Sequence, residues 1–322
     1  MTGQTVNVLE KLAESWGRRA SVRVGPLSFD DEAAYDPSIP DYPLELVPFR
    51  AHPRFTSCSA EQRSRALTLA WLAYNRRTIT GEEWIARPAF EMLSRGHFPG
   101  TQQPAIAQTM IQSVVDEDHH ILLHTLVMQQ TIRRRHLEGL GFTFPAPITC
   151  RALERHRQGL TEPWQRDVLQ LVFATVAEVT VNPYLNLLAE AQGVQPANTF
   201  VAKLHSQDEY RHGRILVHAV RPIYEAMNDA QREFFIRSLP KGLDAFGAHD
   251  FSTWTAILQH VGVDHAEGII SDCIAAGPGR LVRDWSALVQ LGRELGIAER
   301  VAELEPLDRA VSNGPVSRVA DV

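Results

Sequence analysis

The sequence Asp-Glu-x-x-His occurs twice, at residues 116–120 and 208–212, in two long stretches with helical periodicity. On an α-helix, residues that are three apart lie on one face, about one turn from each other. Each copy therefore presents a carboxylate and an imidazole side by side, and both groups bind metal ions. The pairs are Glu117 with His120 and Glu209 with His212. Any fold of this chain has to account for two helices that carry the same metal-binding pair.

A third candidate ligand, His205, precedes the second copy in the stretch KLHSQDEYRHGRIL. With about 100° of rotation per helical residue, His205 points the same way as Glu209 and His212. A single Glu-x-x-His pair is more often a pair on a helix surface than a metal site. Two copies on separate long helices, with a glutamate in an apolar stretch between them, favour a site for two metal ions.

Two adjacent cations repel each other, so such a centre needs further carboxylates. A ferritin-like bundle takes one from each of its two remaining helices. Glu178 lies in the apolar stretch FATVAEVTVNPY, where an unpaired carboxylate would be costly to bury unless it bound a metal. The first long helix offers Glu82 and Glu83 in TITGEEWIARPAF. Adjacent helical residues do not share a face, so only one of the two is expected to be a ligand.

The aspartates that begin the two motifs, Asp116 and Asp208, are candidates to orient the imidazoles through their ring N–H groups. The alternative for each is an acid on the helix surface. His124 is in phase with the first motif, and we expect it to be a core or supporting histidine rather than a ligand. His119 and His218 are out of phase with the ligand faces and are expected to be structural.

Helical periodicity extends over most of the chain, and no stretch shows the alternation typical of paired strands. We therefore predict an all-α fold, a ferritin-like four-helix bundle with additional peripheral helices. Ser59 and Gln62 form a capping box at the start of the first long helix. Gly81 and Pro88 are expected to bend that helix. The long helices are expected at about 59–94, 105–138, 161–193 and 197–226, and shorter ones at about 5–19, 228–238, 252–261, 265–276 and 283–296.

No composition shift divides the chain, so we predict a single ferritin-like domain over residues 1–322. Residues 1–57 are expected to form an N-terminal arm, which is extended over its proline-rich part at 26–57. The tail at 304–322 is polar and is expected to be loose.

Composition excludes several classes of protein. The formal net charge of −6 argues against a general polyanion-binding role. Cys58, Cys150 and Cys273 are scattered, which argues against a disulfide framework and against a thiolate metal site. The N-terminal stretch lacks the apolar core of a signal peptide, and no apolar run approaches the ~20 residues that cross a bilayer. We expect a cytoplasmic protein that binds neither nucleic acid nor membrane.

This pattern resembles the di-iron arylamine N-oxygenases, the p-aminobenzoate N-oxygenase family of the aureothin pathway and its chloramphenicol-pathway relatives. The likeness covers roughly residues 60–290. It rests on the order and spacing of the ligand positions and on the stretch WLAYNRRTITGEEWIARPAF. The resemblance implies that Glu82, rather than Glu83, is the first ligand and that His205 is the additional one that distinguishes this family. The implied ligands are Glu82, Glu117, His120, Glu178, His205, Glu209 and His212.

The resemblance also implies an activity: oxidation of an amine, expected to be an aryl amine, to a hydroxylamine, nitroso or nitro product in secondary metabolism such as antibiotic biosynthesis. The implied cofactor is two iron ions, with manganese as the alternative metal, and O₂ is the co-substrate. The residues themselves leave two other readings open. One is a different ferritin-like di-metal oxidase or hydroxylase, and the other is a non-catalytic metal-binding helical protein.

Substrate and partner expectations follow from the same resemblance. The family holds an aryl carboxylate with a tyrosine and an arginine, for which Tyr74 and Arg283 are the candidates and Arg280 is the alternative. The chain has no glycine-rich nucleotide-binding motif after a strand. An external donor, a ferredoxin-type protein or a small reductant, is therefore expected to supply electrons, and the protein is expected to be a homodimer.

Overall fold

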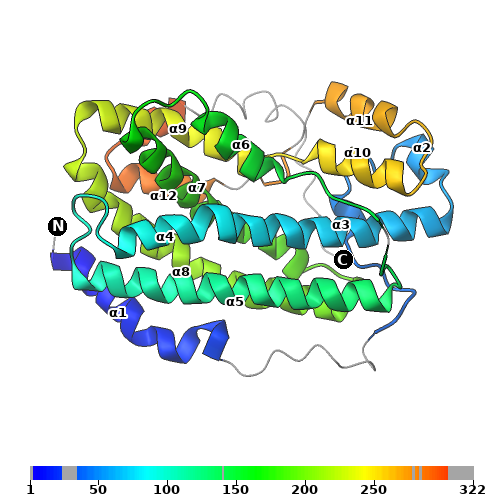
Figure 1. Cartoon of the computed structure of the whole chain (residues 1–322), viewed down its shortest axis with the longest axis horizontal. Helices are drawn as coiled ribbons and strands as arrows, with labels where there is room; N and C mark the ends of the chain where they lie inside the picture. The colour runs from blue at the N-terminus through cyan, green and yellow to red at the C-terminus, as the bar shows by residue number, and fades with distance from the viewer. Residues whose placement is uncertain (1–2, 24–34, 140, 278–279, 283–284, 304–322) are drawn as a thin grey trace, which may run out of the picture.

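The structure is a computed structural model that describes residues 3–23, 35–139, 141–277, 280–282 and 285–303. Over these residues the chain forms helices and loops and no β-strand, so the predicted all-α class is confirmed. The long helices run side by side along the longest axis of the molecule (Figure 1).

Four long helical rods form the bundle. Helix α5 packs against the first rod and against α8, and α7 packs against α8 and against the middle of the first rod, so the four rods close on one another. The predicted four-helix bundle is therefore confirmed. The rods are α3 (Ala60–Gly81) continued by η4 (Glu82–Ala86) and α4 (Arg87–Ser94), then α5 (Pro104–Arg134), α7 (Pro163–Ala189) and α8 (Pro196–Ala226).

Peripheral helices cover the outside of the bundle. Helix α1 packs on α5 and α8, α9 packs on α7, and α10 packs on α3 and α11 (Figure 1). These helices are α1 (Gly3–Arg19), α6 (Ile148–Arg157), α9 (Asp229–Gly247), α10 (Phe251–His260), α11 (Ala266–Ala275), α12 (Ser286–Glu294) and α13 (Ala298–Glu303), with short turns of helix at η1 (Ser21–Arg23), η3 (Leu44–Leu46) and α2 (Pro53–Thr56).

The structure differs from the sequence predictions at α6 and α9. Helix α6 was not predicted, and α9 continues to Gly247, well past the expected end near residue 238. Pro240 lies inside α9, and a proline normally ends a helix because it lacks an N–H donor. The expected loose tail at 304–322, and residues 24–34 of the arm, lie outside the described residues.

A π-helical turn interrupts the first rod where the candidate ligand Glu82 lies. The N–H of Arg87 donates to the carbonyl of Glu82, a hydrogen bond that spans five residues instead of four. Pro88 has no N–H, so the carbonyl of Trp84 lacks its helical donor, and Gln170 of α7 donates to it instead (3.2 Å). The expected bend at this place is therefore a π turn.

Helix α7 is the core helix of the bundle. By length and composition it could cross a membrane, but 83% of its most apolar window is buried inside the molecule. The expectation that no apolar run approaches membrane-spanning length was therefore wrong for α7. Its apolar composition reflects contact with neighbouring helices on every side.

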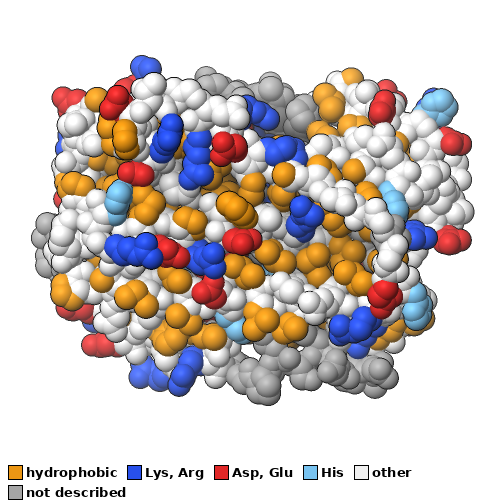
Figure 2. Space-filling view, viewed as in Figure 1, with side chains coloured by type: hydrophobic (Ala, Val, Ile, Leu, Met, Phe, Trp, Pro, Cys, Tyr) orange, Lys and Arg blue, Asp and Glu red, His pale blue; other side chains and the backbone are white. Residues whose placement is uncertain are grey.

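The outer surface of α4 and α5 mixes charged and hydrophobic side chains (Figure 2). Among the hydrophobic ones, Ile111 and Leu122 of α5 are 56% and 49% exposed. Single exposed apolar side chains are normal on a protein surface, so these carry no inference about a partner.

Helices α7 and α8 approach each other most closely at Gly213. A Cβ atom at this position would lie 2.9 Å from the backbone carbonyl oxygen of Glu178. A backbone atom inside a packed helix cannot move aside alone, so the absent side chain is what allows this approach. Gly213 thereby brings the stretch of α7 that carries Glu178 against the ligand-bearing part of α8.

We expect Gly213→Ala to lower the free energy of unfolding by about 1–3 kcal/mol, because the added methyl group forces the two helices apart. Chemical denaturation of the metal-free protein measures this. Gly17→Ala is the matched control, since a Cβ there meets nothing within 4 Å. That change should leave stability equal or raise it by up to ~1 kcal/mol. Equal stability of the two variants would contradict the role given to Gly213.

Candidate metal centre

Seven buried carboxylate and imidazole side chains converge between the four rods. They form two groups, and within each group one ligand atom from every residue lies within 4.8 Å of the others. The structure thus brings together all seven residues proposed from the sequence, while their role as ligands stays a prediction. The first group is Glu82, Glu117, His120, His205 and Glu209, and the second is Glu117, Glu178, Glu209 and His212.

Glu117 and Glu209 belong to both groups and lie between them. Glu117 directs one oxygen to each side: its Oε2 is 3.0 Å from Nδ1 of His120, and its Oε1 is 2.8 Å from Nδ1 of His212. A carboxylate in this position can bind one metal ion through each oxygen. The geometry therefore suits a pair of ions with bridging glutamates.

His205 makes the two groups unequal. Its Nε2 lies 3.1 Å from Oε1 of Glu209 and 3.4 Å from Oε1 of Glu82. The first group accordingly has two imidazoles and the second has one, the asymmetry expected from the sequence. Glu82 is buried, whereas its neighbour Glu83 is exposed, so the structure favours Glu82 of the two candidates.

Some polar atoms at this centre are buried without a hydrogen-bond partner among the described residues. They include Oε2 of Glu178 and Oε2 of Glu209. Unpaired polar atoms are costly to bury, and most buried polar groups in proteins are satisfied. A bound cation would accept these lone pairs. The donor set of four carboxylates and three imidazoles fits two iron or manganese ions.

The carboxylates are electrostatically strained without a cation. Burial, reinforced by repulsion from neighbouring carboxylates, raises the pKa of Glu82 and of Glu178 well above the usual range. Burial acts to lower the pKa of His120 and of His212, but the surrounding carboxylates outweigh it and raise both pKa values well above the usual range. Protons therefore supply part of the compensating positive charge in the metal-free protein.

Each aspartate of the repeated motif contacts the histidine of the other copy. Nε2 of His120 donates to Asp208 (3.2 Å), and Nε2 of His212 donates to Asp116 (3.2 Å). A ring whose Nε2 carries the proton leaves Nδ1 free as a ligand atom, and in both residues Nδ1 faces the carboxylates. The two aspartates thus lie where they can orient the histidines, as proposed from the sequence.

The N-terminal segment holds these aspartates in turn. The indole N–H of Trp16 in α1 contacts both carboxylate oxygens of Asp116 at 2.9 Å. The backbone N–H of Ser21 contacts both oxygens of Asp208 at 3.1 and 3.2 Å, and Arg211 donates to the same carboxylate (3.0 Å). Sequence reasoning missed Trp16 and Ser21, because nothing near them in the chain indicates partners about 100 and 190 residues away.

His124 and His119 lie behind the candidate ligands and contact other side chains. His124 is fully buried and contacts Asn75 and His205, so it is a supporting residue. His119 contacts the hydroxyl of Ser21 (3.1 Å). Burial lowers the pKa of His119 and of His124, which favours their neutral forms.

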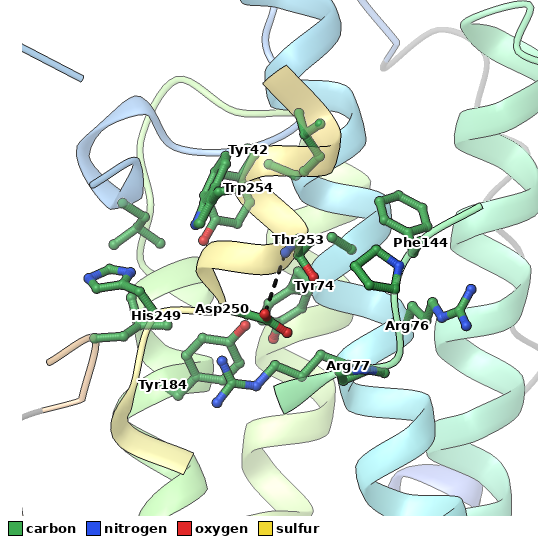
Figure 3. Close-up of a pocket in the computed structure, with 17 residues that line it drawn as sticks. Tyr42, Tyr74, Arg76, Arg77, Phe144, Tyr184, His249, Asp250, Thr253 and Trp254 are labelled. Atoms are coloured by element: carbon green, nitrogen blue, oxygen red, sulfur yellow. Dashed lines mark hydrogen bonds between the residues drawn. The ribbon is translucent and has the colours of Figure 1, made fainter. Parts of the chain in front are cut away.

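Tyr74, the candidate substrate residue, lines a pocket whose described lining includes none of the seven candidate ligands (Figure 3). Its ring lies 5.1 Å from that of Tyr184 and 6.1 Å from that of His124. Arg283 lies outside the described residues, so its role remains a prediction. The alternative, Arg280, forms an ion pair with Asp244 at 2.9 Å.

Arg77 is a pocket residue that sequence reasoning missed. Its guanidinium lies 5.4 Å from the ring of Tyr184, and Figure 3 shows it directed toward that ring, whereas Arg76 points away. It donates to backbone carbonyls at the end of α9, among them that of Phe246 (2.8 Å). No carboxylate of the described residues forms an ion pair with it. The sequence feature that could have indicated Arg77 is its position three residues after Tyr74, on the same face of the helix.

Comparison with known proteins finds a matching family and similar sequences. The family model described as P-aminobenzoate N-oxygenase AurF matches residues 2–296. The chain is also similar to a 4-aminobenzoate N-oxygenase of Streptomyces thioluteus, with 40% identity over 296 residues, which cover 91% of this chain and 87% of that protein.

We expect metal affinity to fall as the pH is lowered, because ligands must lose their protons before they bind. The pKa values of His120, His212, Glu82 and Glu178 are raised. The metal-free protein therefore holds protons that the metal must displace. Calorimetric titration with Fe(II) under anaerobic conditions, in two buffers with different ionisation enthalpies, measures the protons released. A pH-independent affinity without proton release would contradict this account of the centre.

Proposed function

Because the chain belongs to the p-aminobenzoate N-oxygenase family, we propose that it uses O₂ to oxidise the nitrogen of an aryl amine at a centre of two iron ions. The observation that carries the proposal is the buried set of seven donors, some of whose atoms have no hydrogen-bond partner among the described residues. When bound, two iron ions would supply electrons and open coordination positions for O₂ activation.

The chain itself holds and shields the centre. Glu117 and Glu209 would bind both ions, and the aspartates behind His120 and His212 would keep their Nδ1 atoms directed inward. The seven candidate ligands are buried, and the ring of Phe90 packs edge-on against His212 at 5.8 Å. A dry site strengthens the attraction between the carboxylates and the metal ions.

We propose that the pocket of Figure 3 binds the aryl ring and its acidic substituent. The relative from Streptomyces thioluteus is named for 4-aminobenzoate, an aryl amine with a carboxylate. In this chain Tyr74 and Tyr184 provide aromatic faces, and Arg77 provides a cation for the carboxylate. The hydroxyl of Tyr74 is buried without a hydrogen-bond partner among the described residues, so it can also contact a ligand.

The electron donor, the oligomeric state, the location and the pathway are also proposals. The chain is expected to receive electrons from a ferredoxin-type protein or a small reductant, because the described residues form helices and no nucleotide-binding domain. A homodimer and a role in antibiotic biosynthesis remain proposals from the family resemblance, and a cytoplasmic location remains a proposal from the composition.

The proposed reaction is tested with anaerobically purified protein loaded with Fe(II), then given O₂ and 4-aminobenzoate. We expect two iron ions per chain and N-oxygenated products by mass spectrometry. Glu178→Ala should abolish the product and reduce bound iron, because it removes a donor of the second group. Glu190→Ala is the matched control, since Glu190 is an exposed residue at the end of the same helix.

Other outcomes would identify a different function. A product oxidised on carbon would indicate a hydroxylase of the same fold. Iron loading far above two ions per chain, with no product, would indicate storage. Either result overturns the proposal.

We expect Arg77→Leu to raise KM for 4-aminobenzoate by about 10–100-fold, the effect of losing a charge-assisted hydrogen bond of ~1.5–3 kcal/mol. Activity toward aniline, which lacks the carboxylate, should be unchanged, and this separates binding from damage to the fold. Arg76→Leu is the matched control because Arg76 points away from Tyr184 (Figure 3). An equal loss with both substrates would remove Arg77 from the binding site.

A further inference from the structure

A chain of hydrogen bonds runs from α3 through α5 to His205 of α8. Nδ1 of His124 lies 2.7 Å from Oδ1 of Asn75, and Nε2 of His124 lies 2.9 Å from Nδ1 of His205. All three side chains are fully buried. Each of these hydrogen bonds has a donor and an acceptor, and the side chain of Asn75 determines which atom is which.

Asn75 sets the direction. Its Nδ2 donates to the backbone carbonyl of Trp71 at 2.7 Å, so its Oδ1 is the atom that faces His124. An amide oxygen only accepts, and therefore Nδ1 of His124 carries a proton and donates it. The orientation of the amide is thus determined by the helix backbone on which Asn75 sits.

The proton position on His124 then determines the proton position on His205. A neutral imidazole has one donor nitrogen and one acceptor nitrogen, so Nε2 of His124 is the acceptor. Nδ1 of His205 must be the donor to it, which leaves Nε2 of His205 without a proton. That Nε2 is the atom directed at Glu82 and Glu209 in the first group.

His205 differs in this respect from the other two histidines. His120 and His212 direct Nδ1 inward and are supported by carboxylates, whereas His205 directs Nε2 inward and is supported by an imidazole. Either nitrogen of a histidine can bind a metal, and the hydrogen bond at the other one selects between them. The hydrogen-bond acceptor beside Nδ1 therefore selects Nε2 of His205 as the ligand atom.

We propose that His124 and Asn75 are positioning residues that fix His205 as an Nε2 ligand and thereby determine the affinity of the first group for its metal ion. The inference rests on the proposed di-iron function. It goes beyond that function by assigning a role to two residues that need not contact metal or substrate. An apolar ring would fill the same core volume without needing two polar partners, so packing alone does not account for a histidine at position 124.

The test compares two variants of the full chain. His124→Phe keeps an aromatic ring but removes both hydrogen bonds, whereas His124→Gln retains an amide oxygen that can accept from His205. Anaerobic titration with Fe(II) should show one of the two ions bound about 10–100-fold more weakly in His124→Phe and within a few-fold of wild type in His124→Gln. The other ion should bind with unchanged affinity.

A second measurement identifies which ring nitrogen of each histidine binds the metal. In protein loaded with Zn(II) as a diamagnetic probe and labelled at histidine nitrogen, wild type should show one histidine bound through Nε2 and two through Nδ1. His124→Phe should lose the Nε2-bound signal. Asn75→Leu should weaken the same ion, and it provides the test if His124→Phe fails to fold by circular dichroism.

The outcomes separate the two proposals. Wild-type affinity for both ions in His124→Phe, or equal weakening in His124→Phe and His124→Gln, would overturn the positioning role while leaving the di-iron centre intact. A wild-type protein that binds no iron would instead overturn the proposed function itself.

Discussion

Four carboxylates buried between the same helices repel one another, because burial takes them out of the screening that bulk water provides. This repulsion organises the rest of the molecule. The long helices have to lie close enough for Glu117 and Glu209 to face both groups, which the missing side chain of Gly213 permits. They also have to be held firmly enough that the repulsion does not separate them, and the apolar packing of α7 contributes to this.

The need for cations between these carboxylates also explains why each candidate histidine ligand has a hydrogen-bond partner on its other ring nitrogen. A histidine that binds a metal through one nitrogen is fixed only if the other nitrogen has a partner. In the repeated motif the partner comes from the opposite helix, so Asp116 supports His212 and Asp208 supports His120. This crosswise arrangement ties α5 to α8 at the centre itself. His205 has no such aspartate, and His124 takes that place.

Sequence reasoning succeeded where the information is local. Residues three or four apart share a helix face whatever the fold, so the candidate ligands on α5 and α8 could be predicted from spacing alone. The choice of Glu82 over Glu83 depended on the family resemblance, since the π turn that places Glu82 was not foreseen. Helix α6 was missed because its ten residues, ITCRALERHR, contain few apolar side chains and so give a weak periodic signal. The supporting contacts of Trp16, Ser21 and Asn75 join distant segments, and a single sequence carries no sign of them.

The attachment of the N-terminal segment has a consequence for synthesis on the ribosome. Helix α1 emerges first, yet Asp116 follows Trp16 by 100 residues and Asp208 follows Ser21 by 187. While the nascent chain grows, these early donors have no acceptors, and α1 has no complete surface on which to dock until α8 has been translated. Since the late helix also supplies three of the seven candidate ligands, the seven side chains can come together only after α8 has been translated. A chain that terminated before α8 would lack those three candidate ligands.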